Sequence, residues 1–218
     1  RLARRIGIRH LVIQTDEFSN PDYARNPANR CYYCKSELYE RMERLRPELG
    51  VAVIVNGANT DDQGDWRPGT QAANEYRVRS PLIEAGLNKA EVRQLARHWD
   101  LPTWDKPAMP CLSSRVAYGL EVTPERMRQI EAAERFLRQR GFRDLRVRYP
   151  QPETARIEVP VSDIGRLVEP RFRAELVQYF KSLGFKSISV DLEGLRSGSM
   201  NTFLPADALQ LARPLADS

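Results

Sequence analysis

Apolar residues in the first half of the chain gather in short runs on either side of a long amphipathic stretch. The runs within residues 10–15 and 51–55 each have the length of a buried strand, and residues 35–50 between them (KSELYERMERLRPELG) repeat with a helical period. Strand, helix and strand in this order predict a parallel sheet. The polar stretch NTDDQGDWRPGTQ follows the second strand, at the edge where open α/β sheets bind ligands.

Two further helices are expected in this half. Over residues 88–100 Asn88 is the expected N-cap, and Val92, Leu95 and Ala96 fall on one face. The opening residues RLARRIGI have the pattern of the end of a helix, with Gly7 near its C-terminus. Because the chain begins within a helical pattern and without Met, we expect further residues upstream.

The second half of the chain predicts a small α+β domain. Thr123 is a suitable N-cap and Pro124 a suitable first residue for a helix that runs to Gly141. Two alternating strands, another helix and a last strand are then expected at residues 145–149, 155–159, 170–184 and 186–192.

Bulk composition narrows the class of protein. The 218 residues are 41% hydrophobic and 29% charged, typical of a globular protein of one large or two small domains, and we expect two. No apolar run is long enough to span a bilayer, and no signal-peptide pattern opens the chain, so we expect a cytoplasmic protein. A net charge of +5 and a pI near 9.3 favour anionic partners. Phosphate-bearing small molecules would account for this positive charge as well as nucleic acid would.

Three cysteines are the first candidate for chemistry. Cys31 and Cys34 form a short-spaced pair, and Cys111 lies in a Pro-rich loop at the end of the first half. An odd number of cysteines suits a metal or redox role in a reducing compartment. A zinc ion would need a fourth ligand, and His10 and His98 are distant in sequence from the cysteines. A 4Fe-4S cluster held by three cysteines would instead leave one iron free to bind hydrosulfide. The alternative is three buried, inert thiols.

Arginines form the second candidate group. Arg146 and Arg148 alternate along one predicted strand and so share a face, and together with Arg115 they are suited to clamp a phosphate or carboxylate. Ser113 and Ser114 add hydroxyl donors or cap the loop. The alternative is a solvated basic strand face.

A third, weaker group is acidic. Asp61, Asp62 and Asp65 follow a predicted strand, as magnesium or ribose ligands do, although Asp-rich loops are more often only turns. Lys106 is a candidate for binding a phosphate of ATP. No Gly-rich phosphate loop occurs in the chain.

Several sequence stretches, in order, resemble one family. They are NPANRCYYCKSELY, NGANTDDQGDWRPG, VRSPLIEAGLNKAEVRQLARHWDLPTWDKPAMPCLSSRVAYG, LRVRY with ARIEV, and LEGLRSGSMN. The chain thus resembles the LarE family of the PP-loop pyrophosphatase superfamily. The resemblance implies an enzyme that uses ATP to adenylate the carboxylates of pyridinium-3,5-biscarboxylic acid mononucleotide and converts them to thiocarboxylates. The product later receives nickel to become the pincer nucleotide cofactor of lactate racemase.

The resemblance also implies the architecture. The family's SGGxDS phosphate loop would precede residue 1. We therefore expect an α/β PP-loop (adenine nucleotide alpha hydrolase-like) parallel sheet lacking its N-terminal part at residues 1–112. A small α+β domain for substrate binding and oligomerisation follows at residues 113–218. The family also implies a hexamer.

Site residues carried over by the resemblance are as follows. Cys31, Cys34 and Cys111 match the members that hold a 4Fe-4S cluster, to which a sulfide source would deliver sulfur; without a cluster, Cys111 would surrender its own sulfur and become dehydroalanine. Arg115, Arg146 and Arg148 match positions that hold the substrate phosphate, and we expect Ser114 to bind the substrate through its hydroxyl. Glu134 matches an acidic catalytic residue, or is an ordinary exposed helix carboxylate. From their residue types and positions instead, Asp61, Asp62 and Lys106 are the expected contacts of ATP and Mg²⁺.

Two other functions fit the same residues. A tRNA thiolase of the superfamily would use similar cysteines and bind RNA in a salt-sensitive manner, although we do not expect a nucleic-acid partner. A zinc-stapled nucleotide or RNA-binding module would need no phosphate loop.

Overall fold

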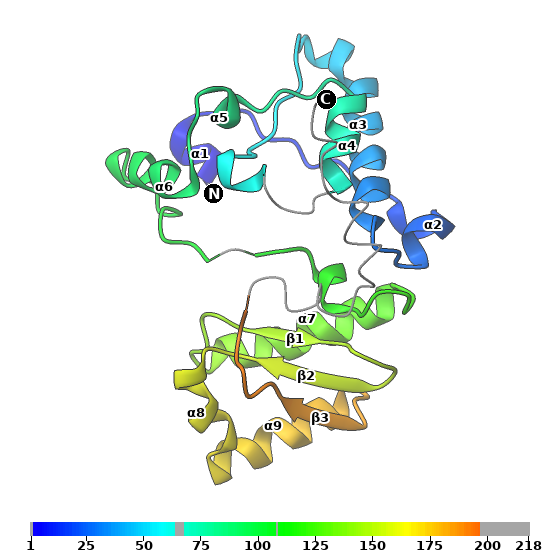
Figure 1. Ribbon diagram of the computed structural model, residues 1–218, viewed down its shortest axis with the longest axis vertical. Helices are drawn as coiled ribbons and strands as arrows, with labels where there is room; N and C mark the ends of the chain where they lie inside the picture. The colour runs from blue at the N-terminus through cyan, green and yellow to red at the C-terminus, as the bar shows by residue number, and fades with distance from the viewer. Residues whose placement is uncertain (1, 64–67, 108, 197–218) are drawn as a thin grey trace, which may run out of the picture. The chain divides into compact units, whose positions relative to one another are not determined.

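The computed structural model describes residues 2–63, 68–107 and 109–196 (Figure 1). They divide into two compact units, one of residues 2–23 and 29–106, the other of residues 24–28 and 107–196. The division after residue 106 lies near the boundary expected after residue 112. The assignment of a PP-loop domain and a substrate-binding domain to the two units stays a prediction.

The first unit is mainly helical. Its helices are α1 (Leu2–Ile6), α2 (Pro21–Ala24, whose last residue belongs to the second unit), α3 (Arg30–Leu49), α4 (Pro68–Glu75), α5 (Pro81–Glu84) and α6 (Lys89–His98), with single 3-10 turns η1 (Glu17–Ser19) and η2 (Thr60–Asp62). A small core forms where α3 packs on α4, around Tyr39, Ile54, Ala72, Ala73 and Val78.

The long helix α3 places the cysteine pair. It begins at Arg30, earlier than the predicted residue 35, so that Cys31 and Cys34 lie near its N-terminus, three residues apart on one face. The helix ends at Gly50, which adopts the left-handed conformation at φ 62°. The predicted helix is therefore confirmed and extended.

The other helical predictions for this unit are also confirmed. Asn88 forms a capping box with Glu91 at the start of α6, and Val92, Leu95 and Ala96 are the half-buried residues of that helix. Gly7 follows α1 with a positive φ.

The strand predicted at residues 10–15 is wrong. These residues form no strand, and Val12 is 83% exposed. Residues 51–55 contribute only one parallel bridge, between Val55 and Arg79. An apolar run becomes a stable strand only when neighbouring strands accept and donate its backbone hydrogen bonds. No ladder of strands surrounds these runs within the described residues, so the parallel sheet of the first half is not formed there.

The second unit is the expected small α+β structure. It contains helices α7 (Pro124–Gln139), α8 (Ile164–Val168) and α9 (Pro170–Ser182), strands β1 (Arg146–Arg148), β2 (Thr154–Glu158) and β3 (Ser187–Val190), and the turns η3 (Leu112–Arg115) and η4 (Val161–Asp163). Thr123 caps α7 by accepting a hydrogen bond from the N–H of Arg126, as predicted.

The sheet of this unit has the order β1-β2-β3. β1 pairs antiparallel with β2, with Arg148 opposite Arg156, and β2 pairs parallel with β3. Helices α7 and α9 lie along one face of the sheet (Figure 1). The core between them is fully buried at Ile130, Leu137, Val147, Ile157, Phe180 and Phe185. No described helix of either unit is both long and apolar enough to cross a membrane.

The buried aromatic core should dominate the stability of the second unit. Phe180 on α9 is 0% exposed and packs against Phe136 and Phe185. We expect Phe180→Ala to lower the free energy of unfolding by about 3–5 kcal/mol, because it leaves a cavity. Val177→Ala, on the same helix but 38% exposed, is the control and should cost much less. Equal losses in urea unfolding would contradict this packing.

Candidate active site

The site of the second unit is built on two buried carboxylates. Glu134 on α7 and Glu158 on β2 are both 0% exposed. Glu134 accepts hydrogen bonds from Nε and Nη2 of Arg115 at 2.8 and 3.3 Å, and from the N–H of Val147 at 3.2 Å. Its Oε2 also lies 2.5 Å from Nη2 of Arg138. Glu134 therefore joins α7, β1 and the η3 loop.

Glu158 holds a second group of arginines. Its Oε2 lies 2.9 Å from Nε of Arg148, and its Oε1 lies 3.4 Å from Nη2 of Arg156. Arg148 also donates from Nη1 to the carbonyl of Ser114 at 3.0 Å. The η3 loop is thus fixed from two sides, at Ser114 by Arg148 and at Arg115 by Glu134.

The same loop presents Cys111. Nη1 of Arg115 donates to the carbonyls of Pro110 and Cys111, at 2.9 and 3.2 Å, and the hydroxyl of Ser114 donates to the carbonyl of Cys111 at 2.7 Å. The backbone at Cys111 is therefore tied down while the residue itself is exposed. A fixed backbone and an accessible thiol suit a residue that handles sulfur.

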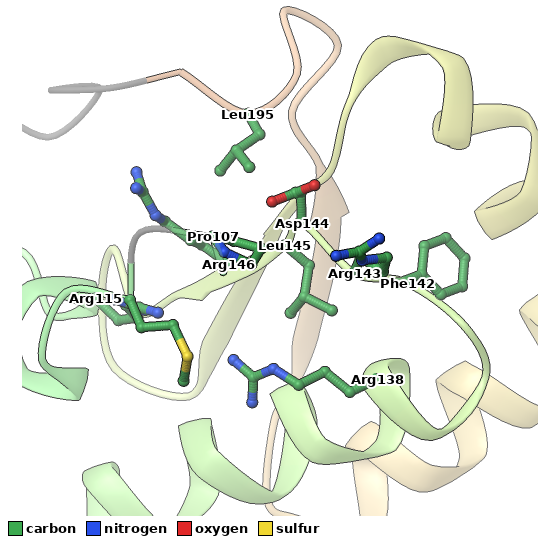
Figure 2. A pocket seen from close by; sticks show the side chains of 10 residues that line it. Pro107, Arg115, Arg138, Phe142, Arg143, Asp144, Leu145, Arg146 and Leu195 are labelled. Atoms are coloured by element: carbon green, nitrogen blue, oxygen red, sulfur yellow. The ribbon is translucent and has the colours of Figure 1, made fainter. Parts of the chain in front are cut away.

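A pocket of about 300 Å³ opens beside this loop (Figure 2). Arginines supply its cationic lining, from Arg115, Arg138, Arg143 and Arg146, and Asp144 is its carboxylate. The rest of the lining is apolar, from Pro107, Met109, Phe142, Leu145 and Leu195. Such a combination suits a ligand that has both a flat apolar part and anionic groups.

The environment of Arg146 indicates that the pocket would bind a negatively charged group. Burial lowers the pKa of the Arg146 guanidinium, and the neighbouring charge of Arg115 lowers it further. Among the described residues, Arg146 forms no ion pair with a carboxylate, although the charges of Glu158 and Glu134 partly oppose the lowering of its pKa. Its Nη1 donates to the carbonyl of Arg196 at 3.2 Å. A guanidinium that is partly desolvated beside another cation is stabilised by an anion.

The predicted arginines therefore have different environments. Arg115 and Arg146 line the pocket together, whereas Arg148 is not among the lining residues. Burial lowers the pKa of Arg148 as well, and its pair with Glu158 opposes that shift. Ser114 contributes to the loop rather than to the pocket lining.

The first unit has a pocket of its own, of about 450 Å³. Helix α3, the segment after Val55 and the start of α4 line it, with Cys31, Lys35, Asn56, Asp62 and Thr70 among its polar residues. Asp62 also accepts a hydrogen bond from the N–H of Asn59, and the carboxylate of Asp61 accepts one from the N–H of Lys89. Asp61 and Asp62 of the predicted acidic group thus stabilise a turn through hydrogen bonds, and Asp62 also lines the pocket.

The remaining predicted residues are placed as follows. Lys106 is exposed and is not among the residues lining this pocket. Asp65 and the last part of LEGLRSGSMN lie outside the described residues.

Cys34 is half-buried, whereas Cys31 is exposed. Within the described residues, no group of three or more His, Cys, Asp or Glu is placed to hold a metal ion. The convergence of the three cysteines stays a prediction, because Cys31 and Cys34 belong to the first unit and Cys111 to the second.

Comparison with known proteins identifies the family. No protein-family model matches the chain. It is 36% identical, over 203 residues, to the pyridinium-3,5-bisthiocarboxylic acid mononucleotide synthase of Lactiplantibacillus plantarum; the match covers 93% of this chain and 72% of the relative. The chain belongs to the LarE family.

Two other relatives of this LarE chain have no assigned function. An uncharacterised protein of Synechocystis sp. is 48% identical over 93% of the chain and 75% of its own length. An uncharacterised protein of Methanocaldococcus jannaschii is 28% identical over 89% of the chain and 73% of its own length.

Sequence reasoning missed three polar residues of this LarE pocket, namely Arg138, Arg143 and Asp144. Arg138 follows Glu134 by four residues on a predicted helix, and that spacing is a recognisable signal for an ion pair. Arg143 and Asp144 precede a strand in a turn, where nothing in the sequence distinguishes them from ordinary surface residues.

Removing the charge of Glu134 should destabilise the second unit. In Glu134→Gln, Arg115 stays buried and loses its charged partner, so we expect a loss of about 3–5 kcal/mol in the free energy of unfolding. The control is Glu131→Gln, one turn earlier on α7, whose carboxylate is 51% exposed in a pair with Arg135. We expect a loss of about 1 kcal/mol or less there. Similar losses in both variants would show that the buried pair does not hold the site together.

Proposed function

We propose that this chain carries the substrate-holding and sulfur-handling residues of an ATP-dependent sulfurtransferase of the PP-loop type. Its substrate is pyridinium-3,5-biscarboxylic acid mononucleotide, whose carboxylates become thiocarboxylates in nickel-pincer nucleotide biosynthesis. The observation that carries the proposal is the arginine-lined pocket built on the same loop as Cys111. The name of the Lactiplantibacillus plantarum relative supports it.

The proposed substrate matches the pocket in charge and in shape. It carries a phosphate and two carboxylates, which guanidinium groups bind through paired hydrogen bonds. Its flat ring suits the apolar wall that includes Met109, Leu145 and Leu195. Arginines that hold the substrate phosphate would orient the carboxyl carbon, which is catalysis by positioning.

The proposed reaction proceeds in two steps for each carboxylate. An oxygen of the substrate carboxylate attacks the α-phosphorus of Mg²⁺-bound ATP, and pyrophosphate leaves. A sulfur nucleophile then attacks the acyl carbon, the bond from carbon to the adenylate oxygen breaks, and AMP leaves with the electron pair. Asp61, Asp62 and Lys106 are the proposed contacts of ATP and Mg²⁺ in this chain. Two rounds convert both carboxylates.

Sulfur enters through the cysteines. Cys31 and Cys34 share a helix face, and Cys31 and Cys111 are exposed, so the donor set suits a 4Fe-4S cluster with three cysteine ligands. When bound, the cluster would supply an iron with an open coordination position for sulfide. The exposed thiol of Cys111 on its fixed loop also suits a sacrificial sulfur donor. The cluster route requires protein that contains iron, whereas the sacrificial route does not.

Arg146 should be required for substrate binding. We expect Arg146→Ala to weaken binding of the dicarboxylate mononucleotide about tenfold or more, because it removes a charged hydrogen-bond donor from a partly desolvated site. Isothermal titration of the full-length protein measures this. Arg135→Ala is the matched control, since Arg135 is 61% exposed in the pair with Glu131. Unchanged affinity in Arg146→Ala, or an equal loss in the control, would contradict the assignment of this pocket.

The three cysteines should be required together for iron. We expect anaerobically purified full-length protein to contain iron and acid-labile sulfide in cluster proportion, and Cys31→Ala, Cys34→Ala and Cys111→Ala each to lose them. Arg135→Ala, at an exposed position of α7, is the control and should retain iron. Protein without iron that becomes lighter by one hydrogen sulfide after turnover would instead identify Cys111 as the sulfur donor.

A further inference from the structure

Arg138 differs from the other arginines of the pocket in how it is held. It lies one turn after Glu134 on α7, and its Nη2 contacts the same Oε2 that Nη2 of Arg115 contacts. Its side chain is 38% exposed, whereas that of Arg115 is 4% exposed. In Figure 2 the guanidinium of Arg138 reaches from the helix into the pocket.

The hydrogen-bond donors of Arg115 are largely consumed by the protein. Its Nε and Nη2 bind Glu134, and its Nη1 binds the carbonyls of Pro110 and Cys111 and the hydroxyl of Ser114. A guanidinium has five N–H groups, so Arg115 has little left for a ligand. Arg115 is therefore suited to fix the loop and to contribute charge.

Arg138 retains the donors that Arg115 lacks. Only its Nη2 is engaged, with Glu134, among the interactions of the described residues. Arg146 is similar, because in the described part of the chain only its Nη1 is engaged, with the carbonyl of Arg196. Both residues line the pocket, so each can offer a planar pair of N–H groups to an anion.

The charges around the pocket call for more than one anionic group. Within the described residues, four lining arginines face one lining carboxylate, Asp144, with Glu134 buried behind them. Cations therefore outnumber carboxylates in the lining of the pocket. Arg146 forms no ion pair with a carboxylate there, whereas Arg138 shares the carboxylate of Glu134 with Arg115 and so carries a partly neutralised charge. The more strongly charged phosphate therefore suits Arg146, and a singly charged carboxylate suits Arg138.

We propose that Arg138 is a substrate-binding residue that holds a second acidic group of the ligand, and so selects a dicarboxylate over a monocarboxylate mononucleotide. The inference rests on the proposed function, because it assigns part of the same substrate to a residue of the same pocket. The competing explanation is structural: Arg138 would only neutralise Glu134. In that case its loss would lower stability without changing the choice between ligands.

The test compares two ligands that differ by one carboxylate. Full-length wild type, Arg138→Ala, Arg138→Lys, Arg146→Ala and the control Arg135→Ala are titrated calorimetrically with pyridinium-3,5-biscarboxylic acid mononucleotide and with its 3-monocarboxylic counterpart. Thermal unfolding of each variant is recorded in parallel, to separate stability from recognition.

We expect wild type and Arg135→Ala to bind the dicarboxylate about tenfold more tightly than the monocarboxylate, the scale of one charged hydrogen-bonded contact. Arg138→Ala should lose this preference and keep its affinity for the monocarboxylate, and Arg138→Lys should restore part of it. Arg146→Ala should weaken binding of both ligands.

Other outcomes overturn the proposal. Arg138→Ala with the wild-type preference would show that Arg138 does not contact the second carboxylate, and an equal loss for both ligands would show a structural role. If wild type binds both ligands equally, the protein does not recognise a second acidic group and the role proposed for Arg138 is wrong. The proposed substrate pocket would be unaffected by that result. If wild type binds neither ligand, the proposed function fails and this inference fails with it.

Discussion

The arrangement of the second unit depends on two carboxylates removed from water. Burying an ionised carboxylate costs several kcal/mol unless cations and N–H groups surround it, so Glu134 and Glu158 require the arginines that they hold. Each carboxylate joins segments that are far apart in sequence. Glu134 joins α7 to β1 and the η3 loop, and Glu158 on β2 reaches the same loop through Arg148.

This pairing gives the pocket its chemical character. The carboxylates fix Arg115 and Arg148 in place but do not balance all the arginines nearby, so positive charge remains beside an apolar wall. The η3 loop that Arg115 and Arg148 hold also carries Cys111, and the stability of the fold and the presentation of the thiol are therefore coupled. Glu134, expected from the family resemblance to be catalytic, is buried behind the arginines, which favours positioning of Arg115 over direct contact with substrate.

Sequence reasoning succeeded where structure is decided locally. The caps at Asn88 and Thr123 and the helices that follow them were predictable, because a capping side chain bonds N–H groups within three residues. Residues 10–15 were not, because a strand needs partners that an apolar run does not specify. For the site, Arg115, Arg146 and Arg148 could be proposed from residue type and spacing. Their division into two that line the pocket, Arg115 and Arg146, and one that does not, Arg148, depends on Glu134 and Glu158, whose burial the sequence does not reveal.

The most direct measurement is the stoichiometry of one reaction. Full-length protein is incubated anaerobically with Mg²⁺, ATP, sulfide and pyridinium-3,5-biscarboxylic acid mononucleotide, and nucleotides and products are separated by chromatography and weighed by mass spectrometry. We expect one AMP and one pyrophosphate for each oxygen of the substrate that is replaced by sulfur, and no reaction without the dicarboxylate. Release of ADP and phosphate, or AMP release without sulfur entering the substrate, would contradict an ATP-dependent sulfurtransferase that works through an acyl-adenylate.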